Sequence, residues 1–395
     1  MGHILHLGVG NFFRAHQAWY TQHCPGWDIT GVSFRSTSIR DGLAAQGYHY
    51  SLVIKDAGGA RIERITCLHD MIVAADAPEA VLAQIAADTT QVITLTVTEK
   101  AYRLGPDGVL DMDDPAICAD LSGGEMTVIG ALARGLARRS APVTVLSCDN
   151  LPDNGTKLGA AVRRFADAAG LRIGTRVTFP SCMVDRITPA TSDAIRTEAG
   201  DAMAVPTEAF SEWVIEDDFA AARPDWPGVQ WVSDVAPHEM RKLRMLNGAH
   251  SYLAYAGTLA GQSFVHEAIG DPALRDGAAG VMAEAAETLP PEVQEQAPRY
   301  AQALLERFDN PNLHHRLRQI AMDGSQKMPI RICATLADRD AHSPALEAAL
   351  SAWVAFVRAE IAAGRVLDDP RSDALADACA SGDPDAALRT LVMPG

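Results

Sequence analysis

The sequence lacks the excess of basic residues found in proteins that bind nucleic acids or anionic membranes. Its 395 residues include 34 lysines and arginines against 50 aspartates and glutamates, which gives a net charge of −16 at pH 7. Because a polyanion would be repelled by this charge, we expect no nucleic acid and no membrane surface among its partners. A small ligand is not excluded, since it responds to the local field and not to the total charge.

The sequence also lacks long apolar runs and paired cysteines. No run reaches the roughly 18 residues that a membrane-spanning helix needs, and the N-terminus has no charged segment before a long apolar core. We therefore expect neither a signal peptide nor a membrane span. The seven cysteines are scattered and contain no Cys-x-x-Cys pair, a pattern typical of reduced thiols in the cytoplasm and not of disulfides or a zinc knuckle.

The first half of the chain alternates strand and helix signals. Helical stretches such as Gly159–Ala169 separate the apolar, β-branched segments. Alternation of this kind predicts a parallel sheet with helices on both faces. The expected strands are Ile4–Leu7, Ile29–Phe34, Val92–Val97, Pro142–Leu146 and Arg176–Phe179.

From Gln262 onward the pattern changes to helices rich in alanine, leucine and glutamate. The expected helices are Ala278–Thr288, Arg299–Phe308, Pro344–Ala362 and Asp373–Ala380. A tryptophan-rich connector between Phe210 and Pro237 lies between the two patterns. The predicted class is α/β, with a Rossmann-like doubly wound domain (residues 1–235) followed by a mostly helical domain (236–395).

A glycine turn stands directly after the first expected strand. Gly8 and Gly10 precede a helical stretch, and glycines there allow a tight turn and a close approach to a pyrophosphate at the helix N-terminus. A full dinucleotide fingerprint would have a third glycine at position 13, where this chain has Phe13. The alternative is a strand-to-helix turn that binds nothing.

The end of the second strand bears on the choice of cofactor. NAD enzymes tend to place an aspartate or glutamate there to bind the ribose hydroxyls. This chain has Phe34-Arg35-Ser36-Thr37 and no acid, and arginine and serine could accept a 2′-phosphate. The alternative is a solvated loop with the ribose contact elsewhere. NAD is the expected cofactor, and NADP is not excluded.

A polar stripe occurs on an otherwise apolar helical segment. With about 100° per residue, the side chains of Glu239, Asn247 and His250 fall near 60°, 140° and 80° from that of Lys242. These four groups share about 140° of arc. Because buried polar groups must be paired or functional, the stripe is a candidate site.

The neighbours of the stripe suggest where solvent lies. Arg241 and Arg244 fall outside the arc and are expected to face water. The alternative interpretation of Lys242 is a side chain that snorkels from the flank of the helix.

Several blocks, in order through most of the chain, resemble the mannitol dehydrogenase family of polyol-specific long-chain dehydrogenases. Members of this family include mannitol 2-dehydrogenases, arabinitol dehydrogenases and enzymes that interconvert mannonate with fructuronate or altronate with tagaturonate. In two respects the chain departs from the family: Phe13 replaces the usual histidine, and the chain is shorter than the long members. The blocks are residues 8–17, 96–100, 146–155, 183–189, 213–217, Lys242 with Asn247 and His250, and 323–327.

The resemblance implies roles for the stripe. Lys242 would be the general base for alcohol oxidation, and Asn150 and Asn247 would donate amide hydrogens to the oxygen that gains negative charge. His250 would orient the substrate or the lysine, and Glu239 would relay the proton to water. The alternatives are a turn asparagine at 150, a core histidine at 250 and a helix-dipole acid at 239.

The resemblance also implies binding residues. Asp185 and His315 are the expected substrate contacts, although a salt bridge of Asp185 with Arg186 is an alternative. With a lysine base and no acid or thiol at zinc spacing, we predict no catalytic metal. The expected cofactor-binding residues are Gly8, Gly10, Asn11, Phe12, Arg35, Thr98 and Glu99.

The predicted function is the NAD-dependent oxidation of a secondary alcohol of a linear polyol, with mannitol to fructose as the lead candidate. Oxidation of mannonate to fructuronate, or of altronate to tagaturonate, is the alternative, and Arg316 or Arg318 could then bind the carboxylate. A nucleotide-binding regulatory protein without turnover is the alternative from another class. A monomer or loose dimer is expected.

Overall fold

A computed structural model of the chain describes residues 2–393, without the side chain of Glu99. Its contacts divide the chain into two compact units. Unit 1 comprises the chain up to Lys55 and the segment Ala60–Ala236, and unit 2 comprises Asp56–Gly59 and the chain from Pro237 onward. Each unit has hydrophobic core clusters of its own and is described separately.

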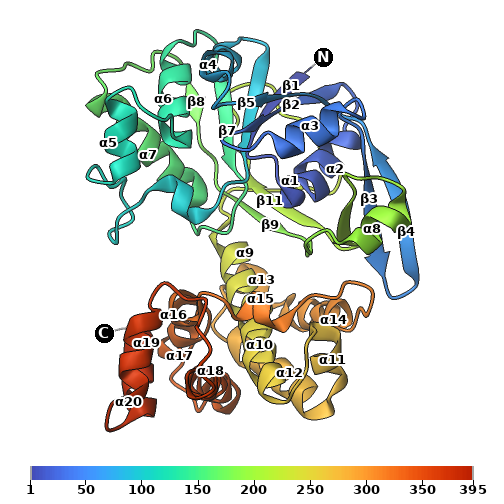
Figure 1. Cartoon of the computed structure of the whole chain (residues 1–395), viewed down its shortest axis with the longest axis vertical. Helices are drawn as coiled ribbons and strands as arrows, with labels where there is room; N and C mark the ends of the chain where they lie inside the picture. Colours follow the sequence, from blue (N-terminus) through green and yellow to red (C-terminus); the bar gives the residue numbers. More distant parts are fainter. Residues whose placement is uncertain (1, 394–395) are drawn as a thin grey trace. The chain divides into compact units, whose positions relative to one another are not determined.

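Unit 1 is built on a six-stranded sheet with the strand order β5-β2-β1-β6-β7-β8 (Figure 1). Every pairing in it is parallel. The order reverses beside β1, so β1 and β6 flank the topological switch point, where ligands of doubly wound sheets bind at the carboxyl ends. The predicted doubly wound sheet is confirmed. Its strands are β1 Gly2–Leu7, β2 Trp27–Ser33, β5 Leu68–Val73, β6 Thr90–Leu95, β7 Val143–Ser147 and β8 Val177–Thr178.

Both faces of this sheet are buried, as a parallel sheet requires. Successive strand residues alternate between two clusters: Ile4 and Val92 belong to one, and Leu5 and Ile93 belong to the other. Residues of α1 and α2 contribute to the first cluster, and residues of α4, α6 and α7 contribute to the second. The helices of unit 1 are α1 Asn11–Ala15, α2 Gln17–Gln22, α3 Ser38–Ala44, α4 Pro78–Ala86, η1 Glu99–Tyr102, α5 Pro115–Leu121, α6 Val128–Ala137, α7 Asn154–Ala168 and α8 Asp193–Ala199.

Two small sheets were not foreseen. One has the order β10-β3-β4 and the other β12-β11-β9. The second includes the segment that was interpreted as a tryptophan-rich connector, and Trp213 and Trp226 are buried in the core of unit 1. The segment is therefore part of the packed unit. The strands are β3 Tyr50–Asp56, β4 Gly59–Ile65, β9 Cys182–Asp185, β10 Val205–Glu208, β11 Glu212–Glu216 and β12 Gln230–Val232.

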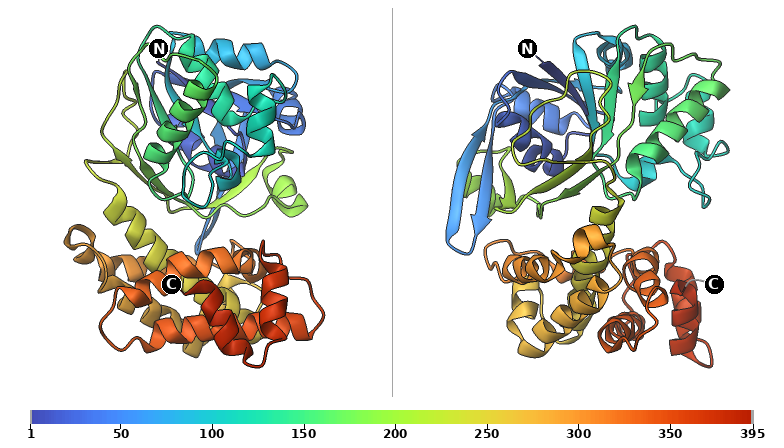
Figure 2. Two further views of the ribbon diagram at one scale, coloured as in Figure 1. Left: turned by 90° about the vertical axis from the view of Figure 1, so that its left-hand side faces the viewer. Right: turned by 180° about the vertical axis from the view of Figure 1, so that it is seen from behind.

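Unit 2 confirms the predicted helical domain. In both views of Figure 2 the described chain after β12, from yellow to red, forms helices joined by loops. Two segments, η2 and η3, are π-helices, which are rare in globular proteins. The helices are α9 Ala236–Arg241, η2 Lys242–Asn247, α10 Gly248–Leu259, α11 Val265–Gly270, α12 Pro272–Ala286, α13 Pro291–Gln294, α14 Ala297–Phe308, α15 Leu317–Ala321, α16 Gly324–Met328, η3 Pro329–Cys333, α17 Ala334–Ala337, α18 Pro344–Ala362, α19 Ser372–Cys379 and α20 Pro384–Val392.

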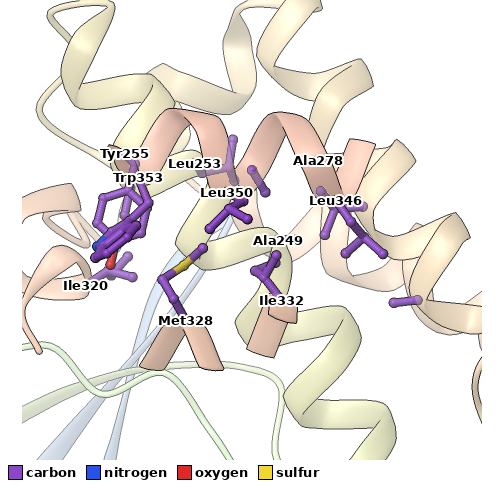
Figure 3. Packing of buried hydrophobic residues seen from close by; sticks show 14 of the residues in the cluster. Ala249, Leu253, Tyr255, Ala278, Ile320, Met328, Ile332, Leu346, Leu350 and Trp353 are labelled. Atoms are coloured by element: carbon purple, nitrogen blue, oxygen red, sulfur yellow. The ribbon is translucent and has the colours of Figure 1, made fainter. Parts of the chain in front are cut away.

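The core of unit 2 is organised around α10. Figure 3 shows Ala249 and Leu253 of α10 beside Leu350 of α18 and Ile332 of η3. All four side chains are fully buried. Since α10 continues directly from η2, this packing also fixes the position of the polar stripe.

We predict that Leu253→Ala lowers the free energy of unfolding by about 2–5 kcal/mol, because it leaves a cavity in this core. Leu259→Ala, on the same helix but with 45% of its surface exposed, is the matched control and should change stability by less than about 0.5 kcal/mol. Urea unfolding followed by circular dichroism measures both. Equal effects of the two substitutions would contradict the central position of α10.

Candidate functional site

A cavity of about 530 Å³ lies at the carboxyl ends of β1, β2 and β6 in unit 1. Its volume is within the range of small-molecule and cofactor sites. Four of the residues predicted to bind cofactor line it, namely Gly8, Gly10, Arg35 and Thr98. The cavity therefore occupies the switch point, where a doubly wound sheet binds dinucleotides.

The two glycines of the turn meet different requirements. Gly8 has φ +99°, and a Cβ there would lie 2.5 Å from the carbonyl oxygen of Thr96. A side chain at Gly8 would thus be strained and would collide with backbone. A Cβ at Gly10 would meet no atom within 4 Å, so the space in front of it is open to a ligand. These residues fit a dinucleotide pyrophosphate, which needs a tight turn and close backbone approach.

His6 supports the turn from within the sheet. The Thr96 hydroxyl donates to the carbonyl of Gly8, so it must accept from Nε2 of His6, at 2.9 Å. Nδ1 of His6 then accepts from the Thr94 hydroxyl at 2.8 Å. Burial lowers the pKa of His6 to about 3, and Phe13 stacks on its ring at 3.6 Å. Phe13, the departure from the family pattern, therefore packs against a neutral imidazole.

Asn11 and Phe12, two further residues predicted to bind cofactor, are not among the described residues that line the cavity. The amide nitrogen of Asn11 donates to the Thr191 hydroxyl at 3.2 Å, and its oxygen accepts from Arg14 at 2.6 Å. Phe12 stacks on His16 with ring centroids 5.1 Å apart. The amide of Asn11 therefore makes one donor and one acceptor contact within unit 1. The side chain of Glu99 lies outside the described residues.

A hydrogen-bond cluster fixes the loop after β7. The hydroxyls of Tyr102 and Ser147 both donate to Oδ2 of Asp149, and the backbone N–H of Leu151 donates to Oδ1 at 2.9 Å. Asn150, between these anchored residues, is exposed. The loop thus presents Asn150 at the carboxyl edge of the sheet, where the sequence places a substrate contact.

Asp185 ends β9 and is 4% exposed. The guanidinium of its neighbour Arg186 donates to the carbonyls of Ala15 and Glu208 and lies over the ring of Trp19. Burial lowers the pKa of Arg186 to about 10. These contacts give Arg186 a structural role in the core of unit 1.

The polar stripe of unit 2 lies on a helix that changes its period. The backbone N–H of Gly248 donates to the carbonyl of Leu243, five residues earlier, which is the π-helical pattern. Residues five apart are therefore neighbours in this turn, so Asn247 lies above Lys242 and not about 140° away as in an α-helix. The sequence contained no signal for this change of period.

This geometry produces one row of polar residues. Glu239 and Lys242 are three apart, Lys242 and Asn247 are five apart across the π turn, and Asn247 and His250 are three apart on the α-helical side. Spacings of three and four on an α-helix, and of five on a π-helix, each keep side chains on one face. We call these four residues the stripe row. Lys242 in it is 9% exposed and His250 is 6% exposed.

The expected solvent exposure of the two arginines was wrong. Arg241 and Arg244 are 3% and 8% exposed. Arg241 stacks over the ring of Tyr300 at 4.3 Å, and Arg244 bonds to the carbonyl of Thr288 and to Asp338. A guanidinium can be buried because its plane stacks on rings and its fork satisfies several acceptors.

Buried His250 and partly buried His315 lie in contact in unit 2. Their rings are perpendicular with centroids 5.5 Å apart, and Phe308 also contacts His250. Burial lowers the pKa of His250 well below its usual value and that of His315 to about 4. Among the described residues, Nε2 of His250 and Nδ1 of His315 have no hydrogen-bond partner. The lowered pKa values favour the neutral form of both rings, and each ring keeps one buried nitrogen without a hydrogen-bond partner among the described residues.

Two further features concern metals and membranes. Among residues 2–393, no group of three or more histidine, cysteine, aspartate and glutamate side chains could hold a metal ion; the expectation of no catalytic metal stays a prediction. No described helix is long and apolar enough to cross a membrane.

A doubly wound sheet with a glycine turn at its switch point, followed by a helical domain, defines a dinucleotide-binding dehydrogenase fold. The chain belongs to the mannitol dehydrogenase family of oxidoreductases: residues 2–228 match the mannitol dehydrogenase Rossmann domain and residues 234–391 the mannitol dehydrogenase C-terminal domain. The resemblance predicted from the sequence is confirmed.

Individual relatives carry different substrate names. The D-mannonate oxidoreductase of Escherichia coli (strain K12) is 40% identical, over 83% of this chain and 74% of the relative. The mannitol 2-dehydrogenase of Pyrenophora tritici-repentis is 36% identical, over 96% of this chain and 74% of the relative. A solved ternary complex of Pseudomonas fluorescens mannitol 2-dehydrogenase with NAD and D-mannitol has a TM-score of 0.84 and 31% identity, over 99% of this chain and 91% of that chain.

We predict that the protein loses stability as the pH falls from about 6.5 toward about 4. The folded pKa of His315, about 4, is lower than its unfolded value, so in this range only the unfolded state takes up the proton. His315→Asn, which cannot titrate, should reduce this loss, whereas His314→Asn on the exposed neighbour should not. Free energies of unfolding measured between pH 7 and pH 4 test this; equal slopes for His315→Asn and the unsubstituted protein would contradict it.

Proposed function

We propose that the protein catalyses the NAD-dependent oxidation of a secondary alcohol of a linear polyol, with mannitol to fructose as the lead reaction. The observation that carries the proposal is the stripe row, in which a buried lysine, an amide and a neutral histidine share one face of a helix. The cavity beside Gly8 and Gly10 supports the part of the proposal that assigns a dinucleotide cofactor. Members of the family that are named for polyols support the substrate class.

Lys242 is the proposed general base. Burial disfavours the charged form of an amine, so a lysine with 9% exposure can take a proton from a hydroxyl group. The carbon that carries this hydroxyl group would lose its hydride to NAD, which supplies the two-electron acceptor when it is bound. We assign to Glu239, one turn before Lys242, the transfer of the proton toward water.

The amide groups stabilise the charge that develops on the substrate oxygen. Asn247 is the neighbour of Lys242 across the π turn, and its N–H can donate to that oxygen. We assign the same role to Asn150. His250 is neutral, and its buried Nε2 is available to a substrate hydroxyl. Asp185 and His315 remain proposed substrate contacts.

We predict that Lys242→Met lowers kcat for mannitol oxidation by a factor of about 10²–10⁴, because the general base is lost. Lys242→Arg keeps a long basic side chain, but its guanidinium stays protonated and cannot act as a base, so this variant should be as inactive as Lys242→Met. Stopped-flow measurement of NADH formation gives kcat, and NAD binding by calorimetry should be unchanged in both variants. Full activity of Lys242→Arg would exclude the role of Lys242 as general base. If the unsubstituted protein turned over no polyol and no sugar acid, that result would favour a regulatory function.

A sugar acid such as mannonate is the second candidate substrate, and the charges around His250 favour it. Arg307 and Arg331 both contribute to lowering the pKa of His250. Arg331, on η3, donates to the hydroxyl of Ser251 beside that histidine at 3.2 Å. Two cations next to a substrate contact form a field suited to a carboxylate.

The arginines that the sequence offered for a carboxylate are engaged elsewhere. Arg318 makes two bonds to Glu360, of 2.9 and 3.2 Å, and with Arg365 it lowers the pKa of Glu360 to about 2. Arg316 lies over the ring of Phe264. We propose Arg331 as the carboxylate contact if the substrate is an acid, because it lies beside Ser251 and His250.

We predict that Arg331→Gln lowers kcat/KM for mannonate by about ten-fold or more and changes that for mannitol little, since one charge-assisted hydrogen bond to the carboxylate is lost. Arg318→Gln is the control of the same charge change and should affect both substrates equally. Steady-state rates with both substrates decide the question. An equal loss for both substrates in Arg331→Gln would assign that residue a structural role.

A further inference from the structure

We propose that the adenosine end of the unit 1 cavity accepts a 2′-phosphate, with Arg35 as its contact and Glu125 as the residue that limits its affinity. The protein would then bind NADP as well as NAD. This inference rests on one part of the proposed function, namely that the cavity binds a dinucleotide.

The position of Arg35 is the first support. β2 ends at Ser33, and Ser33, Phe34 and Arg35 line the cavity. In a doubly wound sheet the residue just after the second strand meets the ribose of the adenosine, and an acid there selects NAD whereas an arginine nearby accommodates the phosphate of NADP. The cavity wall has the arginine and lacks the acid at this strand end.

The charge of the cavity lining is the second support. Three cationic side chains, Arg35, Lys100 and Arg103, line it together with one described acid, Glu125. Arg103 has a partner outside the lining, Asp114, at 3.3 Å. The described lining therefore carries a positive balance in a chain whose total charge is −16, and a dianionic phosphate is favoured there.

The ion pair between Arg35 and Glu125 is the third support. Nε of Arg35 lies 2.9 Å from Oε1 of Glu125, and the side chains are 74% and 70% exposed. Such an exposed pair is easily broken, since water screens it. A phosphate offers two oxygens to the guanidinium fork, so it is the stronger partner for Arg35.

Glu125 lets the same pocket also bind a ribose that carries no 2′-phosphate. In the absence of a phosphate, its carboxylate can accept hydrogen bonds from the ribose hydroxyls, which is the role of the acid in NAD enzymes. With a phosphate present, Glu125 repels it and weakens binding.

Binding of ADP-ribose and of 2′-phospho-ADP-ribose to the full chain tests the proposal without any turnover. These ligands differ only in the 2′-phosphate, and isothermal titration calorimetry gives both dissociation constants. For the unsubstituted protein we expect the two constants to agree within about ten-fold, and the phosphorylated ligand to lose more affinity when salt is added.

Substitutions then identify the contact. Arg35→Ala should weaken 2′-phospho-ADP-ribose by about ten-fold and ADP-ribose by less than about two-fold. Glu125→Gln should strengthen the phosphorylated ligand, because a repulsive charge is removed. Arg40→Ala is the matched control, since Arg40 is near in sequence, pairs with Asp41 and does not line the cavity.

The outcomes separate the inference from the proposed function. If ADP-ribose binds but the 2′-phosphate weakens binding by more than about ten-fold, or if Arg35→Ala weakens both ligands equally, the inference is wrong and the dinucleotide site stands. If neither ligand binds, the cavity is not a dinucleotide site, and both the inference and the proposed function are wrong.

Discussion

The hydrogen bond from the N–H of Gly248 to the carbonyl of Leu243 is the constraint on which the stripe row depends. It inserts one residue into a turn of an otherwise α-helical run, so that Lys242 and Asn247 lie on one face. π-Helical turns are less favourable than α-helical ones and need support from their surroundings. Here the support comes from the core around α10 and from η3, the second π-helix: a Cβ at Gly248 would lie 3.5 Å from the carbonyl of Arg331.

Much of the fold follows from local sequence patterns. Val92–Val97 predicts β6 and Pro344–Ala362 predicts α18, because β-branched runs and amphipathic periods are local signals. The start of α12 was predicted less well. The helix begins at Pro272, six residues before the expected start at Ala278, because the side chain of Asp271 accepts hydrogen bonds from the N–H groups of Ala273 and Leu274. The small sheets were missed because their strands are short and pair with distant segments, which no local pattern reveals.

For the candidate site, residue types were predictable and their environments were not. Lysine, asparagine and histidine could be read from the sequence, but the π turn that aligns them depends on backbone hydrogen bonding with no sequence signal. Arg331 was not singled out, because its importance depends on the proximity of η3 to Ser251 and His250 in space. The sequence predicted solvent exposure for Arg241 and Arg244, because burial of a guanidinium depends on partners far along the chain, such as Tyr300 and Asp338.

The hydrophobic clusters of the two units share no residues. Substitutions at sites that share no packing partners usually have additive effects on stability. The loop after β2 and the helix η3 belong to different units, so the proposed nucleotide contact Arg35 and the proposed substrate contact Arg331 lie in separately packed parts of the chain. A lineage with this architecture can exchange its substrate without rebuilding its nucleotide pocket, which is a physical basis for a family whose members are named for polyols and for sugar acids.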